Sequence, residues 1–270
     1  MELYSTLEYL LTLQNSSQKV EEFKTFYDQY ISGKVTKDMA ADTLIFEKPS
    51  YAGHLNYCDQ KEAPRRSKLG AVRGQILLLH SVAHIEYSAI DLALDAAYRF
   101  RDVGDEFIND WLKVASDEVS HFVMINELLH EMGSFYGEHM VHDALFEASR
   151  QTQTLLERMA VVPRYLEANG LDATPLILHK LEPLRKDPMV EKIIAALQII
   201  LDEEVDHVRR GDRWFHYACE QENVSPDVFF EIIERHYPQS FPRKTAINCE
   251  ARKSAGFECS ELKKISVIEC

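Results

Sequence analysis

Two segments of the chain place a glutamate and a histidine three residues apart. The segment DEVSHF, residues 117–122, contains Glu118 and His121, and the segment DEEVDHV, residues 202–208, contains Glu204 and His207. Three residues make almost one turn of an α-helix, so each pair would project a carboxylate and an imidazole from one helical face. Both groups are ligands of first-row transition metals. The repeated pattern therefore predicts a metal site that uses both pairs.

A third pair, Glu127 and His130, has the same spacing but a different helical environment. At about 100° per residue, the wheel neighbours of Glu118 and Glu204 are mostly apolar, which predicts that both carboxylates are buried. Glu127 falls on the opposite side of the helix that carries Glu118. We interpret the third pair as an exposed chance match.

Buried carboxylates need a counter-charge, and a pair of metal ions would provide it. Dimetal sites in helical bundles add one glutamate from each of two further helices to two Glu-x-x-His pairs. Glu86 has a fully apolar helical environment and is the first of these. For the other, Glu167 and Glu157 are both candidates, and we favour Glu167 because its spacing from the second pair resembles that of Glu86 from the first. The predicted ligands are Glu86, Glu118, His121, Glu167, Glu204 and His207.

Four long segments with helical periodicity carry these residues: 71–104, 105–132, 143–169 and 188–219. We expect Gly104 to cap the first, Pro163 to interrupt the third, and Gly170 to end it. Four long helices with short connections predict an all-α fold, an antiparallel four-helix bundle.

Shorter elements are predicted to flank this bundle. Residues 3–31 have a helical rhythm broken near Asn15, which predicts two short helices, and residues 48–70 have the composition of a loop. Beyond the bundle, a helix over 226–237 precedes a basic tail that we expect to be irregular. The chain is thereby divided into residues 1–70, a bundle over 71–219, and residues 220–270 packed on the bundle.

Composition excludes several classes of partner. The formal net charge of −14 at pH 7 argues against non-specific binding of nucleic acid or of an anionic membrane. The sequence contains neither a signal-peptide pattern nor an apolar run of about 18 residues that would span a membrane. The five cysteines form no CxxC pair, and their odd number leaves one unpaired, which favours a reducing compartment. We therefore expect a soluble, cytoplasmic protein.

Several segments resemble the ferritin-like di-iron carboxylate superfamily, and within it an uncharacterised ferritin-like domain family of bacterial type. The resemblance rests on HSVAHIEYSAIDLALDAAYRF, DEFINDWLKVASDEVSHF, VPRYLEANGLD, LDEEVDHVRRGDRWF and NCEARKSAGF. It implies a ferritin-like four-helix bundle with a dimetal site and the same six ligands. In tRNA-hydroxylase and quinone-hydroxylase relatives an E-A-R-S-type motif supplies the third-helix ligand. Here that motif reads Glu167-Ala168-Asn169-Gly170, with Asn in place of Arg.

Carboxylate-rich sites with two histidines suit iron, the expected metal, or manganese. Our first hypothesis is a di-iron oxidoreductase that activates dioxygen to oxidise or hydroxylate an unknown substrate, with an electron donor as a further partner. The alternative is a ferritin-like protein that handles iron or scavenges peroxide without an organic substrate. A third hypothesis is a metal-free helical interaction module.

Three further residues are weaker candidates for substrate binding. Tyr87 and Tyr165 lie near predicted ligands and are either redox-active or simply packed in the core. Arg252 belongs to the basic tail, where it either faces solvent or meets an anionic substrate.

Overall fold

A computed structural model describes residues 1–38, 43–58, 62, 68–268 and 270. Over these residues the regular secondary structure is helical and the β-pairing is limited to isolated bridges, which confirms the all-α prediction. The chain divides into two compact units, Met1–Arg150 (unit 1) and Gln151–Cys270 (unit 2). The ferritin-like arrangement of four helices and the three-part division at 70 and 219 stay predictions. Parts of the predicted loop at 48–70, residues 59–61 and 63–67, lie outside the described residues.

Unit 1 begins with two short helices, α1 (Leu3–Thr12) and α2 (Ser16–Ile31), as predicted. The α1 amides are capped by the Glu2 carboxylate, which accepts hydrogen bonds from the backbone N–H groups of Tyr4 and Ser5. Asn15 caps α2 by accepting from the backbone N–H of Gln18 at 2.9 Å. Such caps satisfy amides that have no partner inside the helix. The break in the helical rhythm near Asn15 therefore marks the N-cap of α2.

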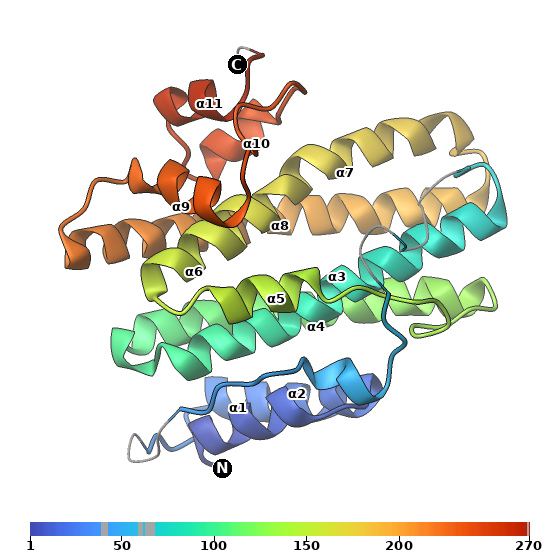
Figure 1. Ribbon diagram of the computed structural model, residues 1–270. Coiled ribbons are helices and arrows are strands. Elements are labelled where there is room, and N and C mark those ends of the chain that lie inside the picture. Colours follow the sequence, from blue (N-terminus) through green and yellow to red (C-terminus); the bar gives the residue numbers. More distant parts are fainter. Residues whose placement is uncertain (39–42, 59–61, 63–67, 269) are drawn as a thin grey trace. The chain divides into compact units, whose positions relative to one another are not determined.

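The core of unit 1 is a hairpin of two long helices, α3 (Val72–Arg99) and α4 (Asp105–Glu131), which pack along each other (Figure 1). A 3-10 turn, η2 (Arg101–Val103), and Gly104 join them. The prediction that Gly104 caps the first helix is wrong: α3 ends at Arg99, and Gly104 precedes α4 with a φ of +121°. Helix α1 packs on α3, and α2 packs on α4. Two shorter helical elements of unit 1 are η1 (Ser50–Gly53) and α5 (Ala144–Gln151).

Helix α3 is long and apolar enough to span a membrane by composition alone, but 78% of its most apolar window is buried inside the protein. That degree of burial is typical of a core helix in a soluble protein. The cytoplasmic localisation itself stays a prediction.

Unit 2 begins with a helix of changing pitch: α6 (Leu155–Val161), a π-helical turn η3 (Val162–Glu167), and α7 (Ala168–Leu181). A proline has no N–H and its ring crowds the carbonyl four residues earlier, so the wider turn around Pro163 lets the helix continue past it. The predicted interruption is therefore confirmed. The predicted end at Gly170 is wrong, because α7 continues to Leu181 and then into a 3-10 turn, η4 (Glu182–Leu184).

The longest helix is α8 (Pro188–Glu222), which packs along α6, η3 and α7. Asp187 caps its first turn by accepting from the backbone N–H of Met189, Pro188 occupies the first helical position, and Asn223 ends it with a φ of +54°. A capping aspartate, a proline in the first turn and a left-handed residue at the end are common signals for the start and the end of a helix.

The C-terminal segment is more ordered than predicted. It forms α9 (Val228–His236), α10 (Cys249–Ser254) and α11 (Cys259–Ile265), so the expectation of an irregular tail is wrong. Both terminal helices are too short to show periodicity in the sequence. Helix α11 is anchored by Arg164, whose guanidinium is fully buried and pairs with Asp212 of α8 at 2.7 Å and with Glu261 of α11 at 2.9 Å. Helix α10 is anchored by Arg252, which pairs with Asp172 of α7 at 2.6 Å.

A disulfide joins Cys249 to Cys270. The sequence favoured a reducing compartment, whereas disulfides persist mainly in oxidising ones. The pairing thus removes the support that the cysteines gave to a cytoplasmic location.

Candidate metal centre

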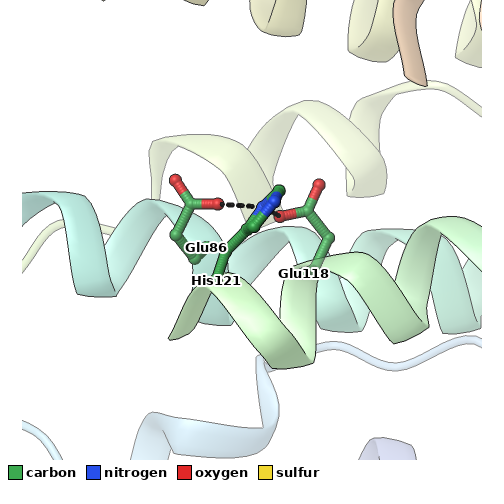
Figure 2. A group of neighbouring side chains, drawn as sticks. All are labelled: Glu86, Glu118 and His121. Atoms are coloured by element: carbon green, nitrogen blue, oxygen red, sulfur yellow. Dashed lines mark hydrogen bonds and ion pairs between the residues drawn. The ribbon is translucent and has the colours of Figure 1, made fainter. Parts of the chain in front are cut away.

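In unit 1, three predicted ligands converge between α3 and α4. Glu86 projects from α3, and Glu118 and His121 project from successive turns of α4 toward it (Figure 2). His121 Nδ1 lies 3.1 Å from a carboxylate oxygen of Glu86 and 3.5 Å from one of Glu118. Each residue offers a ligand atom within 4.8 Å of those of the other two. We call this group the unit 1 triad.

The unit 1 triad is excluded from water, with exposed fractions of 5% for Glu86 and 1% for both Glu118 and His121. Burial, together with the neighbouring Glu118 carboxylate, raises the pKa of Glu86 to about 8. Burial alone would lower the pKa of His121, but hydrogen bonds and attraction from Glu118 and Glu86 outweigh it and raise this pKa to about 11. At neutral pH the metal-free group therefore holds protons where a cation would otherwise sit.

In unit 2, the second Glu-x-x-His pair lies on α8. His207 is fully buried, and its Nδ1 lies 3.4 Å from a carboxylate oxygen of Glu204, whose side chain is 13% exposed. This local geometry repeats that of Glu118 and His121, as the shared spacing predicts.

Packing within unit 2 indicates where Glu167 lies relative to this pair. Pro163 packs against Gly211 so tightly that a Cβ on Gly211 would overlap its ring, and a Cβ on Gly170 would contact Glu204 Cγ at 4.0 Å. The segment 163–170 therefore runs antiparallel to the segment 204–211. Glu167 lies midway along the first segment and His207 midway along the second, so Glu167 is placed opposite the turn of α8 that carries the pair. We call Glu167, Glu204 and His207 the unit 2 triad: the structure brings Glu204 and His207 together, and Glu167 as their third member stays a prediction.

The competing candidate, Glu157, lies on α6, well before this segment. Its carboxylate accepts a hydrogen bond from Arg235 of α9 at 2.8 Å. That ion pair accounts for its charge, and the packing of unit 2 favours Glu167 as the third-helix residue. The assignment of the six residues as ligands stays a prediction.

The other residues singled out in the sequence lie outside the two triads. Glu127 and His130 are exposed, which confirms their interpretation as a solvent-facing pair. Tyr87 is fully buried beside Glu86, and the Tyr165 hydroxyl hydrogen-bonds Ser240 Oγ at 2.8 Å.

Arg252 is 1% exposed and is held by Asp172 and by the backbone carbonyl of Ala168. Arg243 pairs with the same carboxylate at 2.8 Å, so part of the predicted basic patch ties the C-terminal segment to α7. Substrate binding by Tyr87, Tyr165 and Arg252 remains a prediction.

Sequence reasoning missed a buried ion pair next to the unit 1 triad. Lys19 of α2 is fully buried, pairs with Asp91 of α3, and donates to Ser50 Oγ at 2.6 Å. Its Nζ also lies 5.2 Å from the centre of the Tyr87 ring. In the sequence, Asp91 is a charged residue within an apolar helical segment, and this could have indicated a buried ion pair. Lys19 lies among polar residues, so nothing in the sequence indicates that it is buried.

Carboxylate and imidazole donors of this kind suit divalent transition metals, and nothing in the donor set selects one ion. The fold and the site thus define a class, an all-helical protein with a buried glutamate and histidine group that could hold a metal ion.

The chain belongs to the family described as "Protein of unknown function (DUF455)", whose model matches residues 12–263. It is 40% identical over 218 residues to a protein of Haemophilus influenzae described as uncharacterized, an alignment that covers 77% of this chain and 73% of that protein. No solved structure matches the chain.

Proposed function

We propose that this protein is a ferritin-like dimetal carboxylate protein that binds two iron ions and uses them to activate dioxygen for the oxidation of a substrate. The observation that supports it most strongly is the unit 1 triad, in which two glutamates and a histidine share a buried site that could hold a metal ion. The unit 2 triad offers the same three groups on the second helix pair. Manganese fits the same donors.

The proposal explains why the chain keeps acids in its interior. An isolated ionised carboxylate in such a site would be very costly, and a proton or a cation must balance it. In the metal-free protein the protons on Glu86 and His121 fill this role, as their raised pKa values indicate. A divalent ion would displace them and pair with the carboxylates and the imidazole directly.

Iron ions, when bound, supply the electrons for reducing dioxygen or a peroxide. The residues of the chain have three tasks in this proposal. Glu86, Glu118 and His121 bind and orient the metal, and their burial excludes water from it. Glu86 and His121 release protons on metal binding, so binding is expected to be tighter at higher pH.

The first test is the metal content of protein purified without chelator and measured by elemental mass spectrometry. We expect about two iron ions per chain, the number that dimetal bundles hold. A content well below one metal ion per chain would rule the proposal out and favour the metal-free interaction module.

The second test is oxygen uptake by the anaerobically iron-loaded protein. Rapid uptake followed by continued turnover with a reductant supports the oxidase. Uptake that stops once the bound iron is oxidised, with ferric iron accumulating, would instead favour iron handling. Faster reaction with hydrogen peroxide than with dioxygen would favour peroxide scavenging.

A further inference from the structure

A tyrosine and a histidine form a directed hydrogen bond in unit 1, outside the triad. Tyr136, in the segment after α4, places its hydroxyl 2.9 Å from Nδ1 of His84 on α3. The other ring nitrogen of His84, Nε2, lies 2.7 Å from the backbone carbonyl of His142. A carbonyl can only accept, so Nε2 carries a hydrogen, and in the neutral ring Nδ1 then offers its lone pair. Tyr136 is therefore the donor, and its phenolic proton points at a base.

The surroundings of His84 agree with this direction. The ring is 5% exposed and lies between the Tyr136 hydroxyl and the His142 carbonyl. The backbone contact at Nε2 fixes both the tautomer and the orientation of the ring. A phenol aimed at a fixed neutral imidazole can lose an electron and a proton together, which avoids a buried phenol cation.

Aromatic rings connect Tyr136 to residues adjacent to the unit 1 triad. Its ring centre lies 5.4 Å from that of Tyr87 and 5.1 Å from that of Phe122, and these two rings are 5.0 Å apart. Tyr87 follows Glu86 in the chain, and Phe122 follows His121. The Tyr136 ring thus contacts Tyr87, next to the candidate ligand Glu86, and Phe122, next to the candidate ligand His121.

Other rings lead from His84 to solvent. The Tyr51 ring meets the His84 ring edge-on at 5.2 Å, and Tyr57 lies 6.0 Å from Tyr51. Tyr51 is 1% exposed and Tyr57 is 37% exposed. The aromatic path therefore begins beside the unit 1 triad and ends at the protein surface.

We propose that Tyr136, with His84 as its proton acceptor, is a redox-active tyrosine that carries single electrons between the unit 1 metal site and a small reductant at the surface near Tyr57. The inference rests on the proposed function for its oxidant, a peroxide or dioxygen reduced at the metal site. The phenolic O–H bond breaks, an N–H bond forms at Nδ1 of His84, and the electron passes to that oxidant by way of Tyr87. A one-electron reductant such as a thiol then returns the electron, and His84 returns the proton.

The first experiment needs no iron. Metal-free protein is oxidised by flash photolysis with a ruthenium tris-bipyridyl photo-oxidant and an electron-accepting quencher, and the trapped radical is read by electron paramagnetic resonance with ring-deuterated tyrosine. We expect a tyrosyl signal that falls at least about tenfold in Tyr136→Phe. In His84→Gln the hydrogen bond is retained without a base, so the yield falls and the solvent deuterium effect on radical formation is lost.

The matched control is Tyr30→Phe. Tyr30 also lies in unit 1, and its hydroxyl donates a hydrogen bond to the side-chain oxygen of Asn109. This amide oxygen accepts the hydrogen bond but is not a base that takes up the proton. We expect its signal to equal that of the wild type. A signal that survives Tyr136→Phe unchanged would overturn the inference.

The second experiment adds hydrogen peroxide to the iron-loaded protein and freezes it within milliseconds. A tyrosyl signal that disappears in Tyr136→Phe at unchanged iron content supports both the inference and the proposed function. If photolysis oxidises Tyr136 but the iron-loaded protein yields no radical, the redox-active tyrosine stands and its coupling to a metal site fails.

Discussion

The unit 1 and unit 2 triads place the same three residue types in different helical settings. In unit 1, Glu86 projects from the regular 28-residue helix α3 onto the Glu-x-x-His pair of α4, and the three residues are almost fully buried. In unit 2, Glu167 is the last residue of the π-helical turn that contains Pro163, and Glu204 retains partial exposure. The contrast teaches that the Glu-x-x-His spacing fixes a pair on any helix, whereas the third carboxylate depends on how the partner helix is shaped.

The two settings are also braced differently. Beside the unit 1 triad, the buried Lys19 and Asp91 tie α2 to α3 one turn beyond Glu86. Beside the unit 2 triad, the brace is close contact, with Pro163 seated on Gly211. Ionic bracing and steric bracing respond to different substitutions, so the comparison can be tested.

The largest effect on metal binding is expected from breaking the pair in each triad. Glu118→Gln and Glu204→Gln each remove a predicted ligand, and each should reduce metal affinity by at least about 100-fold, because even outer-shell partners of a metal contribute 10- to 100-fold. Isothermal titration with manganese(II), which does not oxidise during the measurement, gives the affinity.

The matched control for these variants is Glu127→Gln, in the exposed Glu-x-x-His pair of the same helix α4, which should bind metal as the wild type does. A loss confined to one of the two triad variants would show that only one triad binds a metal.

The second prediction removes the ionic brace of unit 1. Lys19→Met leaves the buried Asp91 without its cation and is expected to lower the free energy of unfolding by about 3–5 kcal/mol, as for other broken buried pairs. Urea denaturation followed by circular dichroism measures it. The double variant Lys19→Met, Asp91→Leu removes both charges and should recover most of the loss. If the double variant is as unstable as the single one, the loss comes from packing and not from charge.

The third prediction removes the steric brace of unit 2. Gly211→Ala forces a methyl group into the ring of Pro163 and should lower the free energy of unfolding by about 1–3 kcal/mol, as overpacking does. Gly170→Ala is the control, because its added Cβ would meet Glu204 Cγ at an ordinary 4.0 Å. Alanine also favours a helix over glycine. Equal stability of the two variants would contradict the close contact between η3 and α8.

The fourth prediction concerns the pH dependence of the metal-free protein. The folded pKa of Glu86 is about 8 against an ordinary 4.5, so the folded state keeps a proton that the unfolded state loses over that range. Stability therefore falls as pH rises from 4.5 to 8, and the raised pKa of His121 continues this fall between 6.5 and 11.

Glu86→Gln removes the first of these contributions. The metal-free variant should be the more stable protein at pH 8, with a flatter pH profile of its melting temperature and no stabilisation by added metal. Identical profiles for Glu86→Gln and wild type would mean that Glu86 is ionised in the folded protein throughout this range.

Much of the fold could be predicted from local signals. The break at Asn15 and the start of α8 at Pro188 follow from capping residues and proline placement, and acidic residues mark the first turn of α4; these signals act through neighbouring atoms only. The buried positions of Glu118 and His207 follow from the apolar faces of their own helices. Glycines misled the prediction at 104 and 170, because a glycine can end a helix, begin one, or allow a second helix to approach.

By itself, the sequence determined the all-helical class and the two Glu-x-x-His pairs, since both are properties of single segments with a 3.6-residue period. Only the tertiary structure decided that Lys19 meets Asp91, that Tyr136 meets His84, and that Arg164 meets Asp212 and Glu261. These contacts join residues far apart in the chain, where the periodicity of one segment says nothing about the rotation and spacing of its neighbour. Glu86 meeting His121 in unit 1, and the register of α8 against η3 in unit 2, are consequences of how helices pack.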